Sequence, residues 1–397
     1  MSAIPMEFVL FGLTLAAVAL AHRHTLRIAI VGFVLIALYK IFFSSFREMT
    51  GLVGFVNHLN HEWVTVANLL GILLGFALLA KKFEQSRLPE LLPKYLPAGW
   101  RGGFVLLLFI FVLSSFLDNI AAALIGGTIA AGVFQKKLHV GYLAAIVAAS
   151  NAGGAGSVVG DTTTTMIWIA GKSPGDVFAA YVGSVTALVF FAYFASKQQH
   201  AFHPIQQSVR PNLRIQWKRI WAITLILVAA ILANVLCNLY APTVLEIFPV
   251  IGTTVWVAIL VALPISEPHW PELRPAMRGA IFLLSLVLSA SMMPVEELQL
   301  PTWQSTFSLG FLSAFFDNIP LTALALRQGG YDWGFLAYAV GFGGSMIWFG
   351  SSAGVALASN FPEARSAVNW VKAGWHVVVG YVIGFFTLLL VMGWHPR

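Results

Sequence analysis

Charged residues are scarce in this sequence. Aspartate, glutamate, lysine and arginine make up 10% of its 397 residues, whereas 58% are hydrophobic. A chain so poor in charge cannot cover itself with a water-soluble surface, which excludes an ordinary soluble globular domain. The net charge is +7, but the basic residues fall between apolar stretches. There they set membrane topology and do not indicate nucleic-acid binding.

Cysteine is almost absent as well. The one cysteine, Cys237, lies in an apolar stretch, so an internal disulfide is excluded. Long apolar runs are abundant instead, such as Met6–Ala21, Leu26–Phe43 and Trp217–Tyr240. Each is near the length that crosses a hydrocarbon core about 30 Å thick. The sequence therefore predicts an all-α protein that lies in a lipid bilayer.

Two motifs recur in the same order along the chain. Residues 114–120 (Ser-Ser-Phe-Leu-Asp-Asn-Ile) match residues 313–319 (Ser-Ala-Phe-Phe-Asp-Asn-Ile) at five of seven positions. Downstream, residues 153–162 and 343–352 share a Gly-Gly pair and, at the same spacing, a further glycine. A recurrence of this kind indicates an internal duplication.

The segments that carry the Asp-Asn motif are predicted to be re-entrant hairpins. Residues 103–134 would form a single helix about 48 Å long at 1.5 Å per residue, which is too long for the bilayer core. A hairpin puts Asp118 and Asn119 at its tip, where non-helical backbone is tolerated only if it lines a cavity. The second hairpin, 303–327, is predicted from its match to the first.

Each half is then predicted to contain three helices, a hairpin, a Gly-rich broken helix and a final helix. The predicted organisation is a first repeat at 1–196, with a hairpin at 103–134, a broken helix at 140–171 and a helix at 177–196; a cytoplasmic linker at 197–218; and a second repeat at 219–397, with a hairpin at 303–327, a broken helix at 334–360 and a helix at 370–392.

The distribution of basic residues tests the hairpin model independently. If both hairpins re-enter, most of the 23 lysines and arginines fall on one side of the membrane, as the positive-inside rule requires. These residues are Arg23, Arg27, Lys81, Lys82, Arg87, Lys94, Arg101, Lys136, Lys137, Lys197, Arg210, Arg214, Lys218, Arg219, Arg274, Arg278, Arg365 and Lys372. Each half then has an odd number of spans, so about ten transmembrane helices form two repeats of inverted topology, the plan of secondary transporters.

Three aspartates lie in apolar segments: Asp118, Asp161 and Asp317. A charged side chain at the bilayer centre costs roughly 2.5–3.5 kcal/mol on insertion scales, so we expect these aspartates to bind a cation or a proton. The alternative is that each caps a half-helix. The Gly-rich segments 151–157 and 341–345 are predicted to break helices and expose carbonyl groups to a ligand, although close helix packing would also favour glycine.

The same motifs resemble those of the NhaD-type sodium/proton antiporters of the ion transporter superfamily. The resemblance rests on Ser-x-Phe-Leu-Asp-Asn at 114–119, Asn-x-Gly-Gly-Ala at 151–155, Gly-Asp-x-Thr-Thr at 160–164, Asp-Asn-Ile-Pro at 317–320, and Gly-x-Gly-Gly-Ser at 341–345 with Gly-Ser at 350–351. It implies a homodimeric, multi-pass transporter of the inner (plasma) membrane that needs no cofactor, is not an enzyme, and exports Na⁺ or Li⁺ against H⁺.

We predict that the cation and the proton compete for the same carboxylates. The predicted first ion site, for Na⁺ or Li⁺, consists of Asp118, Asn119, Asp161 and Thr162. Further predicted ion-binding residues are Asn151, Gly153, Asp317, Asn318, Gly343, Ser351 and Ser352, of which those in the second half form a pseudo-symmetric counterpart. The predicted proton-coupling residues are Asp118, Asp161 and Asp317.

Two other functions are considered. An anion permease of the same superfamily, for a dicarboxylate, citrate or arsenite, is disfavoured because an aspartate at each hairpin tip would repel an anion, although arsenite is neutral at physiological pH. An intramembrane aspartyl protease needs two aspartates that share a proton, but the Gly-x-Gly-Asp signature of that class is missing before Asp161.

Two further features of the sequence, a polar segment and a set of tryptophans, also allow predictions. Residues 57–62 (Asn-His-Leu-Asn-His-Glu) are predicted to form a solvated loop on the outer side, with a pH sensor or a metal site as the alternative. Tryptophans near the predicted ends of spans, among them Trp370, are predicted to anchor the helices at the membrane interface.

Overall fold

The computed structural model describes residues 5–21, 24–46, 49–206 and 214–397, and these residues are almost entirely helical. Some predictions fall outside the described residues. They concern residues 1–4 of the first repeat, residues 207–213 of the linker, and Arg23 and Arg210 of the charge argument.

The first half of the chain contains ten α-helices among its described residues. They are α1 (Met6–Leu20), α2 (Thr25–Phe43), α3 (Gly51–Gln85), α4 (Leu92–Tyr95), α5 (Trp100–Ser114), α6 (Asn119–Val133), α7 (Val140–Ala155), α8 (Thr162–Ile169), α9 (Pro174–Phe178) and α10 (Ala180–Phe202), with a 3₁₀ turn η2 (Pro89–Leu91) and a short antiparallel strand pair, β1 (Ser45–Phe46) and β2 (Met49–Thr50). Helix α10 continues beyond residue 196 into the segment predicted as a linker.

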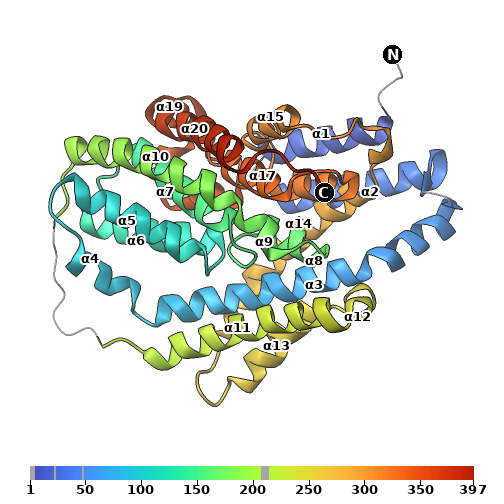
Figure 1. Ribbon diagram of the computed structural model, residues 1–397, viewed down its shortest axis with the longest axis horizontal. Helices are drawn as coiled ribbons and strands as arrows, with labels where there is room; N and C mark the ends of the chain where they lie inside the picture. The colour runs from blue at the N-terminus through green and yellow to red at the C-terminus, as the bar shows by residue number, and fades with distance from the viewer. Residues whose placement is uncertain (1–4, 22–23, 47–48, 207–213) are drawn as a thin grey trace.

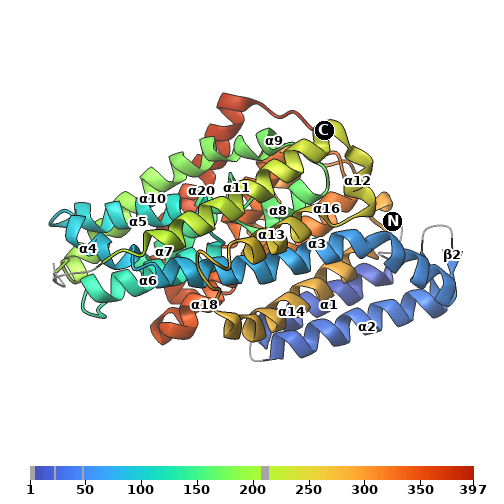
Figure 2. The ribbon, with the colours of Figure 1, turned by 90° about the horizontal axis from the view of Figure 1, so that it is seen from below.

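The second half contains α-helices, short 3₁₀ turns and one π-helix. They are α11 (Trp217–Tyr240), α12 (Pro242–Ile247), α13 (Val250–Val261), η3 (Trp270–Glu272), α14 (Leu273–Ser291), η4 (Val295–Glu297), α15 (Trp303–Ser313), α16 (Asn318–Gln328), α17 (Trp333–Leu336), the π-helix η5 (Ala337–Phe342), α18 (Ser352–Asn360), η6 (Pro362–Arg365), α19 (Ala367–Ala373) and α20 (Trp375–Met392). Helix α13 packs against α3, whereas α14 packs with α2 on the opposite flank of α3 (Figure 2).

Helix α3 runs along much of the length of the molecule (Figure 1). It has 35 residues, so it is about 52 Å long and exceeds the hydrocarbon core. Its carboxyl end meets the start of the second half, because Gln216 N–H donates to the carbonyl of Ser86 at 3.0 Å. We call this end of the molecule the linker side, and the end at Gly51 the opposite side.

Both Asp-Asn segments consist of two helices that are interrupted just before the motif. Helix α5 ends at Ser114 and α6 begins at Asn119, and the two helices pack against each other (Figure 1). In the same way α15 ends at Ser313 and α16 begins at Asn318. An aspartate at this position favours the start of a helix, because its carboxylate accepts a hydrogen bond from a free N–H of the first turn.

The Gly-rich segments also interrupt helices. Helix α7 ends at Ala155 and α8 begins at Thr162. The hydroxyls of Thr164 and Thr165 donate to the carbonyls of Ser157 and Val158, at 2.5 and 2.8 Å. These bonds satisfy backbone groups that the break leaves without helical partners. In the second half the π-helix η5 precedes the break, and α18 follows it.

Six helical stretches among the described residues are long and apolar enough to cross a membrane. They are Thr25–Phe43, Gly51–Tyr95, Pro174–Phe202, Trp217–Cys237, Trp270–Ser291 and Trp375–Met392. Shorter apolar helices accompany them, including α1, α5, α6, α7 and α13. The chain is therefore an all-α membrane protein, and the total of about ten spans stays a prediction.

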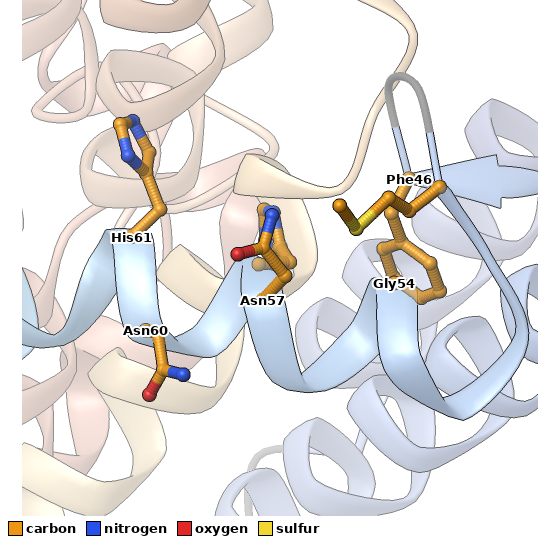
Figure 3. A pocket seen from close by; sticks show the side chains of 7 residues that line it. Phe46, Gly54, Asn57, Asn60 and His61 are labelled. Atoms are coloured by element: carbon orange, nitrogen blue, oxygen red, sulfur yellow. The ribbon is translucent and has the colours of Figure 1, made fainter.

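The polar segment at residues 57–62 is not a loop. It lies within α3, and Figure 3 shows Asn57 and His61 on one side of this helix and Asn60 on the other. His58 is buried and its Nε2 lies 2.9 Å from Ser291 Oγ, while Glu62 forms an ion pair with Arg327. The loop prediction was wrong because these polar groups find partners on neighbouring helices and do not need water.

The prediction for Trp370 was also wrong. Trp370 belongs to α19 and its side chain is buried. Its indole N–H donates to the carbonyl of Ser345 at 3.1 Å. The predicted final helix 370–392 is interrupted at Gly374, so Trp370 precedes α20. Trp370 is therefore part of the packing around the broken helix of the second half and not an interfacial anchor.

Candidate ion site in the membrane

Four helices begin at the centre of the molecule, and a polar side chain caps each of them. The carboxylates of Asp118, Asp161 and Asp317 accept from backbone N–H groups of α6, α8 and α16 at 3.1, 3.3 and 3.1 Å. Ser351 accepts from Gly354 N–H at the start of α18. The capping role weighed in the sequence analysis is therefore observed for all three aspartates. A cap uses part of the acceptor capacity of a carboxylate and leaves lone pairs for a ligand.

Asp161 is the point at which the two halves of the chain meet. Asn119, at the start of α6, donates to Asp161 Oδ1 at 3.3 Å, and Asn318, at the start of α16, donates to Asp161 Oδ2 at 3.4 Å. Both distances are at the long end of the hydrogen-bond range. The carboxylate is thus held between one amide from each half, and neither amide holds it tightly.

Asn151 extends this network into the second half. It accepts from Asn119 Nδ2 at 3.1 Å, and its own Nδ2 donates to Ser345 Oγ and Ser351 Oγ at 3.0 and 3.1 Å. Asn151, Ser345 and Ser351 are completely buried. The predicted first site and its pseudo-symmetric counterpart therefore form one connected polar cluster.

Asp317 has a different environment from Asp161. It accepts from the hydroxyl of Ser352 at 2.9 Å as well as from its helix N–H. It is only half-buried, as is Asp118, whereas Asp161 is 2% exposed. The sequence difference between the halves, Asp161 against Ser351, thus gives the cluster one fully buried carboxylate.

Gly153 and Gly343 stand apart from this cluster. A Cβ on Gly153 would lie 2.1 Å from the carbonyl oxygen of Phe111, and one on Gly343 would lie 2.3 Å from that of Gly310. Both glycines therefore let a broken helix approach the first helix of the neighbouring pair. The carbonyl of Gly153 already accepts from Ser115 and Tyr181 hydroxyls at 3.1 and 3.2 Å. Both glycines thus allow close packing of helices, and their part in ion binding stays a prediction.

A cavity of about 500 Å³ reaches the cluster from the linker side. Its inner lining includes Asp118, Asn119, Asp161, Thr162, Asn318 and Ser352. Its walls are the apolar faces of α3 and α14, and Lys81, Glu84 and Glu272 line it farther out. The cavity therefore connects the buried carboxylates to a group of charged side chains on the linker side.

The ion pairs of the described residues do not include the three aspartates. Among the described residues, no lysine or arginine forms an ion pair with Asp118, Asp161 or Asp317. The described residues also contain no cluster of three or more His, Cys, Asp and Glu side chains that could hold a metal ion. The cluster offers carboxylate, amide and hydroxyl oxygens, which are the ligands that hard cations prefer.

Two parts of this site could not be predicted from the motifs. Ser345 was seen only as the end of a Gly-rich segment, yet it accepts from both Asn151 and Trp370. Lys81 was used only in the count of basic residues, and Glu84 and Glu272, which line the same cavity, were not singled out. No local pattern marks either feature, because both depend on how distant helices pack.

Comparisons with known proteins identify the relatives of this chain. No family model matches it. Sodium/proton antiporter 1 of Arabidopsis thaliana is 25% identical over 84% of the chain and 61% of its own length. The Na⁺/H⁺ antiporters NhaD of Vibrio cholerae and Vibrio parahaemolyticus are 24% and 26% identical over 84% and 75% of the chain, and over 80% and 84% of their own lengths.

The chain is similar to the NhaD-type sodium/proton antiporters. The resemblance that the motifs indicate is thereby confirmed over most of the chain. The NhaD-type relatives are named as antiporters, which are transporters and not enzymes. The chain spans 61% of the length of the first plant relative, so that protein contains more than the part matched here.

Proposed function

We propose that this protein exchanges Na⁺ or Li⁺ for H⁺ across the membrane, with Asp161 as the group for which the cation and the proton compete. The observation that carries the proposal is the environment of Asp161. It is almost fully buried, has no basic counter-ion among the described residues, and lies at the end of a cavity. The negative charge of a buried carboxylate without a counter-ion is costly, and uptake of a proton or a cation removes that cost.

Asp118 and Asp317 supply further acceptor groups on either side of Asp161. Asn119 and Asn318 orient its two oxygens, and Thr162 adds a hydroxyl to the lining. Binding of the cation displaces the proton, and protonation releases the cation, so the two transported species cannot occupy Asp161 together. No cofactor takes part in this cycle.

Charge also argues for a cation over an anion. The amino ends of α6, α8 and α16 carry the positive end of the helix dipole, which would attract an anion if their caps were neutral. Each of these three helices is capped by an aspartate instead. The carboxylates repel citrate or a dicarboxylate, so the anion permease is the weaker candidate.

The topological part of the proposal rests on the repeated motifs. We infer that the helix pairs α5–α6 and α15–α16 are re-entrant hairpins, that the two halves are inverted in the membrane, and that the linker is cytoplasmic. The interruption of both pairs before the Asp-Asn motif supports the hairpins. A homodimer in the inner membrane is proposed on the resemblance alone.

The test uses purified protein in proteoliposomes that contain a pH-sensitive dye. NaCl, LiCl, KCl or sodium citrate is added against a fixed pH gradient, to wild type and to the variants Asp161→Asn and Asp332→Asn. Asparagine caps helices about as well as aspartate, so both variants should fold. Asp332 is the matched control, because it caps α17 in the same way but lies outside the site.

We expect NaCl or LiCl to dissipate the gradient with wild type and Asp332→Asn, and not with Asp161→Asn. Dissipation by citrate alone would leave the fold intact and show that the chain carries an anion. Equal exchange by Asp161→Asn and wild type would remove Asp161 from the mechanism.

A further inference from the structure

The lining of the cavity at the ion site extends from Asp161 toward the linker side. Along α3 its lining begins at Leu69 and continues to Glu84 on the linker side. On the opposite side a separate cavity of about 680 Å³ is lined by Glu7, Lys40, His58 and Arg327, among others. Between the two cavities lies an apolar cluster that includes Leu69, Met166, Met292, Ile319 and Ala323.

One ion pair connects α16 to α3 on the opposite side. Arg327 Nη1 lies 3.2 Å from Glu62 Oε1, and each side chain is 14% exposed. Glu62 lies on α3 about two turns before Leu69, where the lining of the ion-site cavity starts. Arg327 lies in the last turn of α16. The pair therefore holds the end of α16 next to α3 on the opposite side of the molecule.

Helix α16 links this ion pair directly to the ion site. Asn318, which holds Asp161, is its first residue, and Arg327 is in its last turn. The helix has 11 residues, so it is a rigid rod about 16 Å long. Any movement that separates α16 from α3 at Glu62 must therefore also move the amide that contacts Asp161.

We propose that the Glu62–Arg327 ion pair is a gate that closes the ion site on the side opposite the linker, and that it must break for the site to open there. The proposal rests on the antiport function above, since an exchanger has to expose its site to both sides in turn. Opening the gate places Arg327 in the cavity of the opposite side, which it already lines, and exposes α16 to that solvent.

A neighbouring ion pair provides a matched control. Lys40 Nζ lies 4.0 Å from Glu7 Oε1, and Lys40 also donates to the carbonyl of Met292. Both side chains are somewhat more buried than those of the gate, and they line the same cavity as Arg327. This pair joins α1 to α2, neither of which carries a predicted site residue. Its loss should not open the ion site.

The first test measures access to the site. Cys237→Ser removes the native thiol, and Ile319→Cys places a reporter next to Asn318 in the lining of the ion-site cavity. Right-side-out vesicles receive a membrane-impermeant maleimide on the outside. The neutral pair Glu62→Gln with Arg327→Gln is compared with Glu7→Gln with Lys40→Gln, because removing both charges avoids leaving one of them buried alone.

We expect the outside labelling rate of the reporter to rise about tenfold in the Glu62/Arg327 variant and to stay unchanged in the Glu7/Lys40 variant. An unchanged rate in the Glu62/Arg327 variant would show that the pair is merely structural. Labelling does not require exchange. If the labelling rate rises but the wild-type protein shows no cation/proton exchange, the gate is supported and the proposed function is contradicted.

The second test holds the gate closed with a covalent bridge, so it does not use the variant with Glu62→Gln and Arg327→Gln. In the Cys237→Ser background, Glu62→Cys and Arg327→Cys are bridged with a short, reducible, bifunctional thiol reagent. We expect bridging to lower exchange by about tenfold, and reduction to restore it. Full exchange by protein whose bridge is verified by mass spectrometry would overturn the gate.

Discussion

At the scale of single residues, the sequence identified most of the polar cluster but not its connections. Asp118, Asp161 and Asp317 stand out because charge is rare in apolar segments. The bond between Asn318 and Asp161, in contrast, joins positions 157 residues apart. Such a contact depends on how the two halves interlock, which no local pattern reports. The motifs therefore assigned Asn318 to a separate second site, whereas it contacts the central carboxylate.

Asn151 offers a test of this cluster at one residue. Asn151→Ala leaves Asn119, Ser345 and Ser351 without their shared partner in a buried region, and each unsatisfied group costs about 1–3 kcal/mol. We expect a lower thermal unfolding temperature in detergent and a higher apparent KM for Na⁺. The adjacent Ser150→Ala is the control, because among the described residues the Ser150 hydroxyl bonds only within α7, to the carbonyl of Val147. Equal effects of the two variants would contradict the bridging role of Asn151.

At the scale of elements, the positions of breaks between helices were easier to predict than the lengths of the helices. Both Asp-Asn motifs follow an interruption between helices, and a helix break begins within each Gly-rich segment, although residues 151–155 are still helical. The length of α3 was underestimated because residues 57–62 are polar, and polarity usually indicates solvent. His58 and Glu62 remain helical because Ser291 and Arg327 from other helices satisfy them. Partners on distant elements are the information that the sequence pattern lacks.

Gly153 tests the packing of these elements. Gly153→Ala places a methyl group 2.1 Å from the backbone oxygen of Phe111, so α7 must move away from α5. Since α7 also carries Asn151, we expect loss of exchange together with reduced stability. Gly132→Ala in α6 is the matched control: nothing lies within 4 Å of its added Cβ, and alanine favours a helix by about 1 kcal/mol over glycine. If Gly153→Ala keeps wild-type exchange and stability, the close contact is not required.

At the scale of the whole molecule, the orientation in the membrane rests on charge alone. Helix α3 spans from the opposite side to the linker side, and its carboxyl end carries Lys81 and Lys82. The basic residues near the linker belong to the same side. The positive-inside rule places that side in the cytoplasm. We therefore predict that the cavity that reaches Asp161 faces the cytoplasm, from which the proposed exporter would collect its cation.

Two exposed histidines at the two ends of the molecule test this orientation. In the Cys237→Ser background, His200→Cys lies near the end of α10 on the linker side, and His61→Cys lies on α3 toward the opposite side. In intact cells a membrane-impermeant maleimide should label only the His61→Cys protein, and after permeabilisation it should label both. Labelling of His200→Cys alone in intact cells would mean that the chain is inserted the other way. The cavity at Asp161 would then collect the cation from outside, and the direction of exchange would have to be reversed.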